Sequence, residues 1–207
     1  MIYCLIPAKP HIESKSRLSP MLTEAQRAAL SRWLLQRTVL LARAAVEQVV
    51  VVSRDQALLS VAQAQGAWGL LEASPGLNPA LEQGARFAQA RRASGLLILP
   101  ADLPHLRVQD LETILNLGTR FPGLVIAPCH RGTGTNALLM RPPQLIPFAF
   151  GPDSFATHCA AARKAGVEPT LYHADSVAFD LDSPQDWNSL PASWKSEIFH
   201  FTDLPSG

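Results

Sequence analysis

Apolar and polar positions along the chain follow two alternating patterns. Short apolar runs are separated by longer segments in which apolar residues recur every three or four positions. The runs fit strands buried on both faces of a sheet, and the longer spacing fits helices with one apolar side. Predicted strands cover residues 2–7, 49–52, 69–72, 96–99, 124–127, 136–140, 170–173 and 177–179. Because most of them alternate with helices, the pattern predicts an α/β fold, a mostly parallel mixed sheet flanked by helices.

Capping signals sharpen the helix boundaries. Predicted helices cover residues 23–45, 55–64, 78–93, 108–117 and 154–165, with a last turn from 183. Thr23 and Gln26 have the spacing of a capping box, and Asp55 suits an N-cap. Asn78 before a proline predicts a further cap, and Ser154 or the residue before it predicts another. Beyond about residue 191 no periodicity is visible, so we expect one domain over 1–190 and a tail over 191–207.

Composition narrows the class of protein. The 207 residues favour one fairly large domain. Charged residues make up 17% and the formal net charge is +1, so a protein that binds nucleic acid through a general positive field is not expected. The three cysteines are scattered and show no metal-ligand spacing. The N-terminus does not resemble a secretory signal, and no apolar stretch approaches the ~20 residues of a membrane span. We therefore expect a cytoplasmic protein that does not enter a membrane.

Charged side chains follow the predicted strands, where ligands of open α/β sheets bind. Lys9, Lys15 and Arg17 come after the first strand and suit a triphosphate, although a basic solvated loop has the same composition. Asp102 follows an apolar strand and suits Mg²⁺, which prefers carboxylates together with substrate phosphates. Asp180 and Asp182 form a further acidic pair, with side chains on opposite faces if the chain is extended. Each carboxylate alone also fits an ordinary turn.

Two small-residue segments suit an anion. The turn 132–136 contains two glycines and offers hydroxyls and backbone N–H groups, although a plain hairpin loop would look the same. The segment 150–154 leads into a helix, whose N-terminus attracts a phosphate or serves only as a cap. Neither the P-loop motif nor the glycine-rich dinucleotide motif occurs in the chain.

The motifs become more specific in combination and in order. They are Ile6-Pro7-Ala8-Lys9-Pro10, Lys15-Ser16-Arg17-Leu18, Gly76-Leu77-Asn78-Pro79-Ala80-Leu81, Pro100-Ala101-Asp102-Leu103-Pro104, Gly134-Thr135-Asn136-Ala137-Leu138-Leu139, Phe150-Gly151-Pro152-Asp153-Ser154-Phe155 with His158, and Phe179-Asp180-Leu181-Asp182-Ser183-Pro184-Gln185-Asp186. Over about residues 2–190 the chain resembles the 2-phospho-L-lactate guanylyltransferase family. The resemblance implies a single-domain nucleotidyltransferase fold of the glycosyltransferase-A type. It also implies transfer of GMP from GTP to 2-phospho-L-lactate, phosphoenolpyruvate or 3-phospho-D-glycerate in the biosynthesis of coenzyme F(420).

The same resemblance implies roles for individual residues. The residues expected to bind the phosphorylated acid are Thr135, Gly151 and Ser154. The residues expected to bind the nucleotide are Lys9, Lys15, Arg17 and Asn78, and those expected to hold Mg²⁺ are Asp102, Asp180 and Asp182. Lys9 and Asp102 are the expected catalytic residues. A downstream transferase would take over the product, and a homodimer is one option for the assembly.

Two alternatives stay open at this point. One is a nucleotidyltransferase for molybdopterin or a sugar phosphate, which would usually carry a glycine-rich segment after strand one, where this chain has Pro7-Ala8-Lys9-Pro10. The other is a non-catalytic nucleotide-binding module, since a fold does not fix a function.

Overall fold

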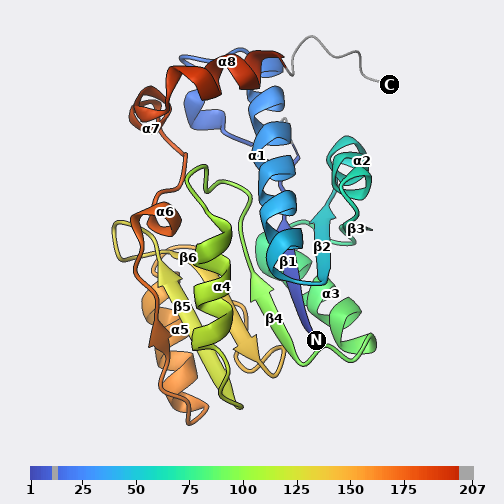
Figure 1. The fold of residues 1–207 in the computed structure, drawn as a ribbon, viewed down its shortest axis with the longest axis vertical. Helices are drawn as coiled ribbons and strands as arrows, with labels where there is room; N and C mark the ends of the chain where they lie inside the picture. The colour runs from blue at the N-terminus through green and yellow to red at the C-terminus, as the bar shows by residue number, and fades with distance from the viewer. Residues whose placement is uncertain (11–13, 201–207) are drawn as a thin grey trace.

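A seven-stranded sheet forms the centre of the molecule (Figure 1). The computed structural model describes residues 1–10 and 14–200. The strands are β1 (Ile2–Pro7), β2 (Gln48–Ser53), β3 (Trp68–Leu71), β4 (Gly95–Ile98), β5 (Gly123–Pro128), β6 (Thr135–Arg141) and β7 (Thr170–Leu171). They lie in the order β3-β2-β1-β4-β6-β5-β7, and β6 alone is antiparallel to its neighbours. The predicted mostly parallel mixed sheet is confirmed.

Helices cover both faces of this sheet. The first face carries α1 (Glu24–Ala45), α2 (Gln56–Ala64), α4 (Val108–Leu117) and α6 (Asp175–Ala178); the other carries α3 (Leu77–Ala90) and α5 (Ser154–Lys164). Successive residues of β1 face opposite sides, so Cys4 and Ile6 join one apolar core while Tyr3 and Leu5 join the other. This two-sided burial explains why the strands read as continuous apolar runs.

A third apolar cluster lies beside the first half of α1. It joins the 3₁₀ turn η1 (Ser16–Leu18), α7 (Pro184–Ser189) and α8 (Ala192–His200) to that helix. Ile198 of α8 is fully buried, and Trp194 packs on Trp33 with ring centroids 5.7 Å apart. Figure 1 shows α8 crossing the end of α1. Part of the expected tail is therefore an ordered helix. It escaped detection because Ile198 alone among its nine residues is buried, so no periodic apolar pattern forms. Residues 201–207 lie outside the described residues.

Side-chain caps mark where α1 and α2 begin. Both hydrogen bonds of the capping box at Thr23 are present, and the carboxylate of Asp55 accepts from two N–H groups at the start of α2. At α3, however, the cap is Gly76, and the predicted cap Asn78 is already inside the helix. Asp153 is the cap of α5 but makes no side-chain cap bond, and Ser154 is the first helical residue.

The stretch after α5 differs most from the prediction. The expected strand over 177–179 is wrong, because residues 175–178 form the helical turn α6. The neighbouring strand β7 pairs with β5 over only two residues. The amide of Asn136 donates to the backbone carbonyls of Val177 and Ala178 at 2.9 and 3.1 Å. These hydrogen bonds give partners to the backbone carbonyls at the end of α6 and hold α6 against β6. Among the helices of the described residues, none has the length and apolar character needed to cross a membrane.

Candidate functional site

A cavity of about 510 Å³ opens at the carboxyl ends of β1, β2 and β4. It is lined by segments that follow these strands and by the first turn of α3. The charged side chains on its wall are Lys9, Lys15, Arg17, Arg54, Glu72, Asp102 and Asp182. Ligand sites of open α/β sheets occupy this edge, as the sequence predicts. Residues 11–13, in the middle of the basic segment, lie outside the described residues.

Lys15 connects the basic and acidic parts of the cavity. Its Nζ donates to Oδ2 of Asp102 at 3.2 Å and to Oδ1 of Asp182 at 3.3 Å. Its side chain is only 7% exposed, whereas those of Asp102 and Asp182 are 31% and 43% exposed. Burial alone would lower the pKa of Lys15, but the two carboxylates outweigh burial and hold the pKa above its ordinary value. A buried positive charge is therefore stable between these carboxylates.

The more exposed Arg17 reaches the same carboxyl group as Lys15. Its guanidinium lies 3.7 Å from Oδ2 of Asp182, with the arginine side chain 74% exposed. Lys9 also lines the cavity and is exposed. All three predicted basic residues thus lie at one cavity, and two of them contact an acidic residue directly.

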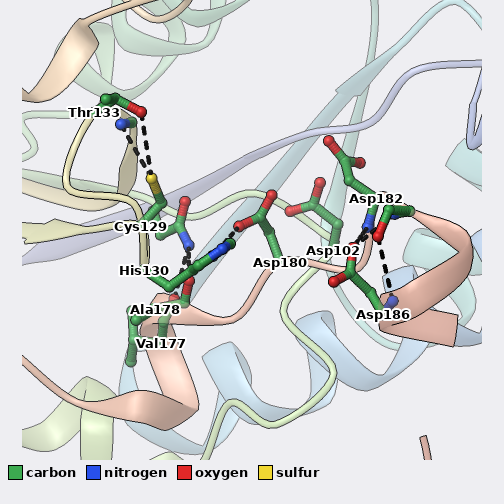
Figure 2. Close-up of polar contacts among 12 residues, drawn as sticks. Asp102, Cys129, His130, Thr133, Val177, Ala178, Asp180, Asp182 and Asp186 are labelled. Atoms are coloured by element: carbon green, nitrogen blue, oxygen red, sulfur yellow. Dashed lines mark hydrogen bonds and ion pairs between the residues drawn. The ribbon is translucent and has the colours of Figure 1, made fainter. Parts of the chain in front are cut away.

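The three predicted acidic positions come together through the backbone. The N–H of Leu181 donates to the carbonyl of Asp102 at 3.0 Å, which places Asp180 and Asp182 on either side of the segment that follows β4. Figure 2 shows Asp102 between the other two carboxylates. Burial, and then the charges of Asp102 and Asp182, raise the pKa of Asp180. Its Oδ1 faces Nδ1 of His130 at 3.7 Å, so Asp180 and Asp182 have different partners.

Asp182 is held in place by a capping box. The carboxylate of Asp186 accepts from the backbone N–H groups of Asp182 at 3.0 Å and of Ser183 at 2.6 Å, and the hydroxyl of Ser183 accepts from the N–H of Asp186 (Figure 2). Burial alone would raise the pKa of Asp186, but these hydrogen bonds outweigh burial and lower it. The start of α7 therefore fixes the loop that presents Asp182 to the cavity.

The acidic residues suit a hard divalent cation that is shared with a substrate. Within residues 1–10 and 14–200, no group of three or more His, Cys, Asp or Glu side chains is arranged to hold a metal ion. Mg²⁺ seldom uses such a cage, because it takes one or two carboxylates and completes its shell with water and phosphate oxygens. Asp102 and Asp182, which already accept a positive charge between them, match this requirement.

Two charged residues of the cavity escaped the sequence analysis. Arg54 directly follows β2, Glu72 directly follows β3, and their side chains pair at 3.2 Å. Glu72 also accepts from the N–H of Gly76 at 2.9 Å and so steadies the turn before α3. Arg54 lies after a predicted strand, which is the signal that drew attention to Asp102, whereas the predicted strand 69–72 included Glu72.

The turn between β5 and β6 does not leave all its N–H groups available to an anion. The N–H of Gly134 donates to Sγ of Cys129 at 3.1 Å, and the Thr133 hydroxyl lies 3.9 Å from the same sulfur (Figure 2). Burial would raise the pKa of Cys129, but hydrogen bonds from the backbone of Gly134, Thr133 and Arg131 lower it overall. The hairpin interpretation of this turn is confirmed.

The residues expected to bind the acid lie at the start of β6 and of α5. Backbone N–H of Thr135 donates to Oγ of Ser154 at 3.0 Å, and Oγ1 of Thr135 lies 3.0 Å from Nδ1 of His158. All three side chains are buried. Gly151, with φ of +141°, lies three residues before Ser154 and accepts from its N–H at 3.2 Å. Burial lowers the pKa of His158 to about 4, so this imidazole is neutral at pH 7.

Asn78 joins the first turn of α3 to the segment before Gly151. Its amide donates to the carbonyl of Phe150 at 3.1 Å and accepts from the N–H of Phe150 at 2.9 Å. Its neighbours Gly76 and Leu77 line the cavity, whereas the side chain of Asn78 faces the segment that leads to Gly151. This pairing explains why Asn78 is not the helix cap.

The sheet, with one antiparallel strand and its charged cavity at the carboxyl edge, has the fold of nucleotidyltransferases and related glycosyltransferases. Two solved structures share the fold at 14% and 13% identity. The first, from Desulfovibrio desulfuricans and described as a nucleotide-diphospho-sugar transferase, has a TM-score of 0.71 and matches 98% of this chain and 95% of its own. The second is glucosyl-3-phosphoglycerate synthase from Mycobacterium tuberculosis, solved with Mn²⁺, uridine diphosphate and phosphoglyceric acid. It has a TM-score of 0.60 and matches 100% of this chain and 80% of its own.

Sequence comparison gives the family. The chain belongs to the family described as guanylyl transferase CofC like, whose pattern matches residues 2–191. It is 44% identical to a phosphoenolpyruvate guanylyltransferase from Rubrobacter xylanophilus, over 93% of this chain and 94% of that protein. It is 32% identical to a 3-phospho-D-glycerate guanylyltransferase from Colwellia psychrerythraea, over 90% of this chain and 89% of that protein.

Proposed function

We propose that the protein transfers GMP from GTP to a three-carbon phosphorylated acid and releases pyrophosphate, and that phosphoenolpyruvate is the first acid to test. The family membership and the names of its relatives support guanylyl transfer. Phosphoenolpyruvate comes first because the relative at 44% identity carries that name. The other candidates are 3-phospho-D-glycerate and 2-phospho-L-lactate.

The observation that carries the proposal is the pairing of charges at the 510 Å³ cavity. Lys9, Lys15 and Arg17 supply positive groups at its wall, where a triphosphate needs them, and Asp102 and Asp182 face the same space. The nucleoside would lie along the first turn of α3, the turn that contains Asn78. Such local neutralisation works in a chain whose net charge is only +1.

Asp102 and Asp182, with Asp180 beside them, would hold Mg²⁺ together with phosphate oxygens of GTP. Bound there, the metal would neutralise charge that develops at the α-phosphate and on the departing pyrophosphate. Lys15, whose ammonium contacts both carboxylates, would add a further positive charge beside the metal and the phosphates. The solved relative in fold that contains Mn²⁺ supports the use of a divalent cation.

Thr135, Gly151 and Ser154 would hold the acid at the other half of the site. An oxygen of its phosphate would attack the α-phosphorus of GTP in line with the leaving oxygen, forming one P–O bond while the bond to pyrophosphate breaks. The nucleophile is already anionic, so no general base is required. Positioning and charge neutralisation, with Lys9 and Asp102 as the expected catalytic residues, would supply the acceleration.

The product would pass to a downstream transferase in the cytoplasm, within the biosynthesis of coenzyme F(420). Family membership favours this reaction over transfer to molybdopterin or to a sugar phosphate. The three acidic positions, which a non-catalytic module would not need, favour an enzyme.

The test incubates the protein with GTP, Mg²⁺ and one acid at a time, together with the transferase that consumes the product. Pyrophosphate release and the mass of the coupled product are measured. We expect pyrophosphate with at least one of the three acids, and release slowed on the order of 100-fold or more in the matched variant Asp102→Asn. The absence of product with all three acids would contradict the proposal, and product with a sugar phosphate would support the alternative enzyme.

A further inference from the structure

We propose that His158 is a positioning residue of the acid subsite, which sets the direction of the hydrogen bonds at Thr135 and fixes the segment before Gly151. This inference rests on the proposed function, because it assigns the support of the subsite that would bind the acid. His158 is fully buried, comes from α5, and contacts both β6 and the segment before Gly151.

The two ring nitrogens of His158 have partners that fix its tautomer. The backbone N–H of Ala149 points at Nε2 at 3.1 Å. An amide N–H can only donate, so Nε2 must accept and carries no proton. In the neutral imidazole the proton therefore sits on Nδ1, which lies 3.0 Å from Oγ1 of Thr135 and donates to it. A proton on Nε2 would point at the N–H of Ala149, so that two donors would face each other. If Nδ1 kept its proton as well, the ring would also carry a buried positive charge.

The direction of these bonds decides what the two hydroxyls can offer a ligand. Oγ1 of Thr135 accepts from His158, and Oγ of Ser154 accepts from the backbone N–H of Thr135. Both hydroxyl protons are thus left for another acceptor, and within the described part of the chain neither has one. Ser154 lies at the start of α5, where the helix end is positive, and Thr135 of β6 is bonded to it. Two hydroxyl donors placed there suit the carboxylate and phosphate of an acid. The opposite tautomer would turn Thr135 toward His158 and remove one donor.

The second bond of His158 fixes the backbone that leads to Gly151. Ala149 is held by His158, and the next residue, Phe150, is held at both N–H and carbonyl by Asn78. The ring of Phe150 also packs edge-on against His158, with centroids 4.8 Å apart. Gly151 follows immediately, in a backbone conformation that favours glycine. One buried ring therefore sets both the Thr135 side and the Gly151 side of the subsite.

Three variants separate the two bonds of His158. His158→Asn keeps an amide donor near the position of Nδ1, and His158→Gln keeps an acceptor near the position of Nε2, whereas His158→Phe keeps only the ring shape. Cys159→Ala is the matched control, because Cys159 is the next buried residue of α5 and contacts neither Thr135 nor Ala149 by a hydrogen bond. Circular dichroism confirms which variants fold, and steady-state kinetics give KM for the acid, KM for GTP and kcat.

We expect His158→Gln and His158→Asn each to raise KM for the acid roughly tenfold, and His158→Phe to raise it further. KM for GTP should stay within about twofold, because His158 and the two groups that it bonds, on Thr135 and Ala149, do not line the nucleotide cavity. Thr135→Val combined with His158→Gln should add little to Thr135→Val alone. If His158→Phe does not fold, the KM values of His158→Asn and His158→Gln for the acid and for GTP test the inference. ¹⁵N NMR of wild-type histidine provides an independent check and should show a proton on Nδ1 of His158 and none on Nε2.

Equal changes in the KM of acid and GTP, kinetics like those of Cys159→Ala in the folded variants, or a proton on Nε2 would overturn the inference while the proposed function stands. A wild-type protein that transfers GMP to none of the three acids would overturn the proposed function and the inference together. The two failures are therefore distinguishable.

Discussion

His158 should make the free energy of unfolding depend on pH between about 6.5 and 4. Burial lowers the pKa of this imidazole to about 4, from an ordinary value of about 6.5. Between these pH values the unfolded chain binds a proton that the folded chain does not, so stability is lost as the pH falls. The difference in pKa predicts a loss of about 2 kcal/mol at pH 5 and about 3 kcal/mol at pH 4 from this residue alone.

Urea unfolding of the wild type and of His158→Gln at pH 7, 6 and 5 isolates this contribution. Glutamine takes up no proton in this range. The free energy of unfolding of the wild type minus that of His158→Gln should therefore be smaller at pH 5 than at pH 7 by about 2 kcal/mol. His173→Gln, which replaces an exposed histidine, is the control and should lose stability in parallel with the wild type. A constant difference between wild type and His158→Gln at all three pH values would refute the reasoning about the neutral buried ring.

Three further predictions concern the charged cavity and the C-terminal helix. Asp102→Asn should lower guanylyl transfer by on the order of 100-fold or more in a pyrophosphate assay, yet change the free energy of urea unfolding by about 1 kcal/mol at most, because Asp182 still pairs with Lys15. Asp102→Asn together with Asp182→Asn should lower the free energy of unfolding by about 3 kcal/mol or more, because the double change leaves the buried ammonium of Lys15 without these partners. This loss should exceed the sum of the losses in the two single variants, and additive losses would contradict the reasoning. Ile198→Ala should cost about 2–4 kcal/mol in the same unfolding experiment, because its side chain is fully buried in α8, and a change below 1 kcal/mol would mean that α8 contributes little to stability.

The parts of the fold that could be predicted from sequence are those that local physics decides. Thr23 and Asp55 cap their helices through bonds to the next two or three residues, so the sequence window contains both partners. The apolar runs of the central strands reflect burial on both faces, which also needs no knowledge of the partner strand. The candidate cavity was predictable in part, because Lys9, Lys15 and Asp102 lie in the segments after β1 and β4. Asp182, in contrast, follows the helical turn α6 and not the strand that the sequence predicts.

Contacts between distant parts of the chain could not be predicted in this way. Asn78 has the sequence pattern of a cap, but its amide is satisfied by Phe150, 72 residues away. Lys15 pairs with Asp182 across 167 residues, and neither residue type reveals the other. Arg54 was missed because a single charge in a loop looks like an ordinary surface residue, and Glu72 was missed because the predicted strand 69–72 included it.

The two halves of the site use different physics, and this difference bears on how an acid substrate would be selected. On the proposed function, the nucleotide half works through full charges, with Lys15 between Asp102 and Asp182, and attraction between full charges is tolerant of geometry. The network at Thr135, Ser154 and His158 is neutral, and its hydrogen bonds have fixed directions. Three-carbon acids that share a carboxylate and a phosphate differ little in charge, so on the proposed function discrimination must come from these directed bonds. The orientation imposed by one buried imidazole would then matter for specificity more than any charge in the cavity.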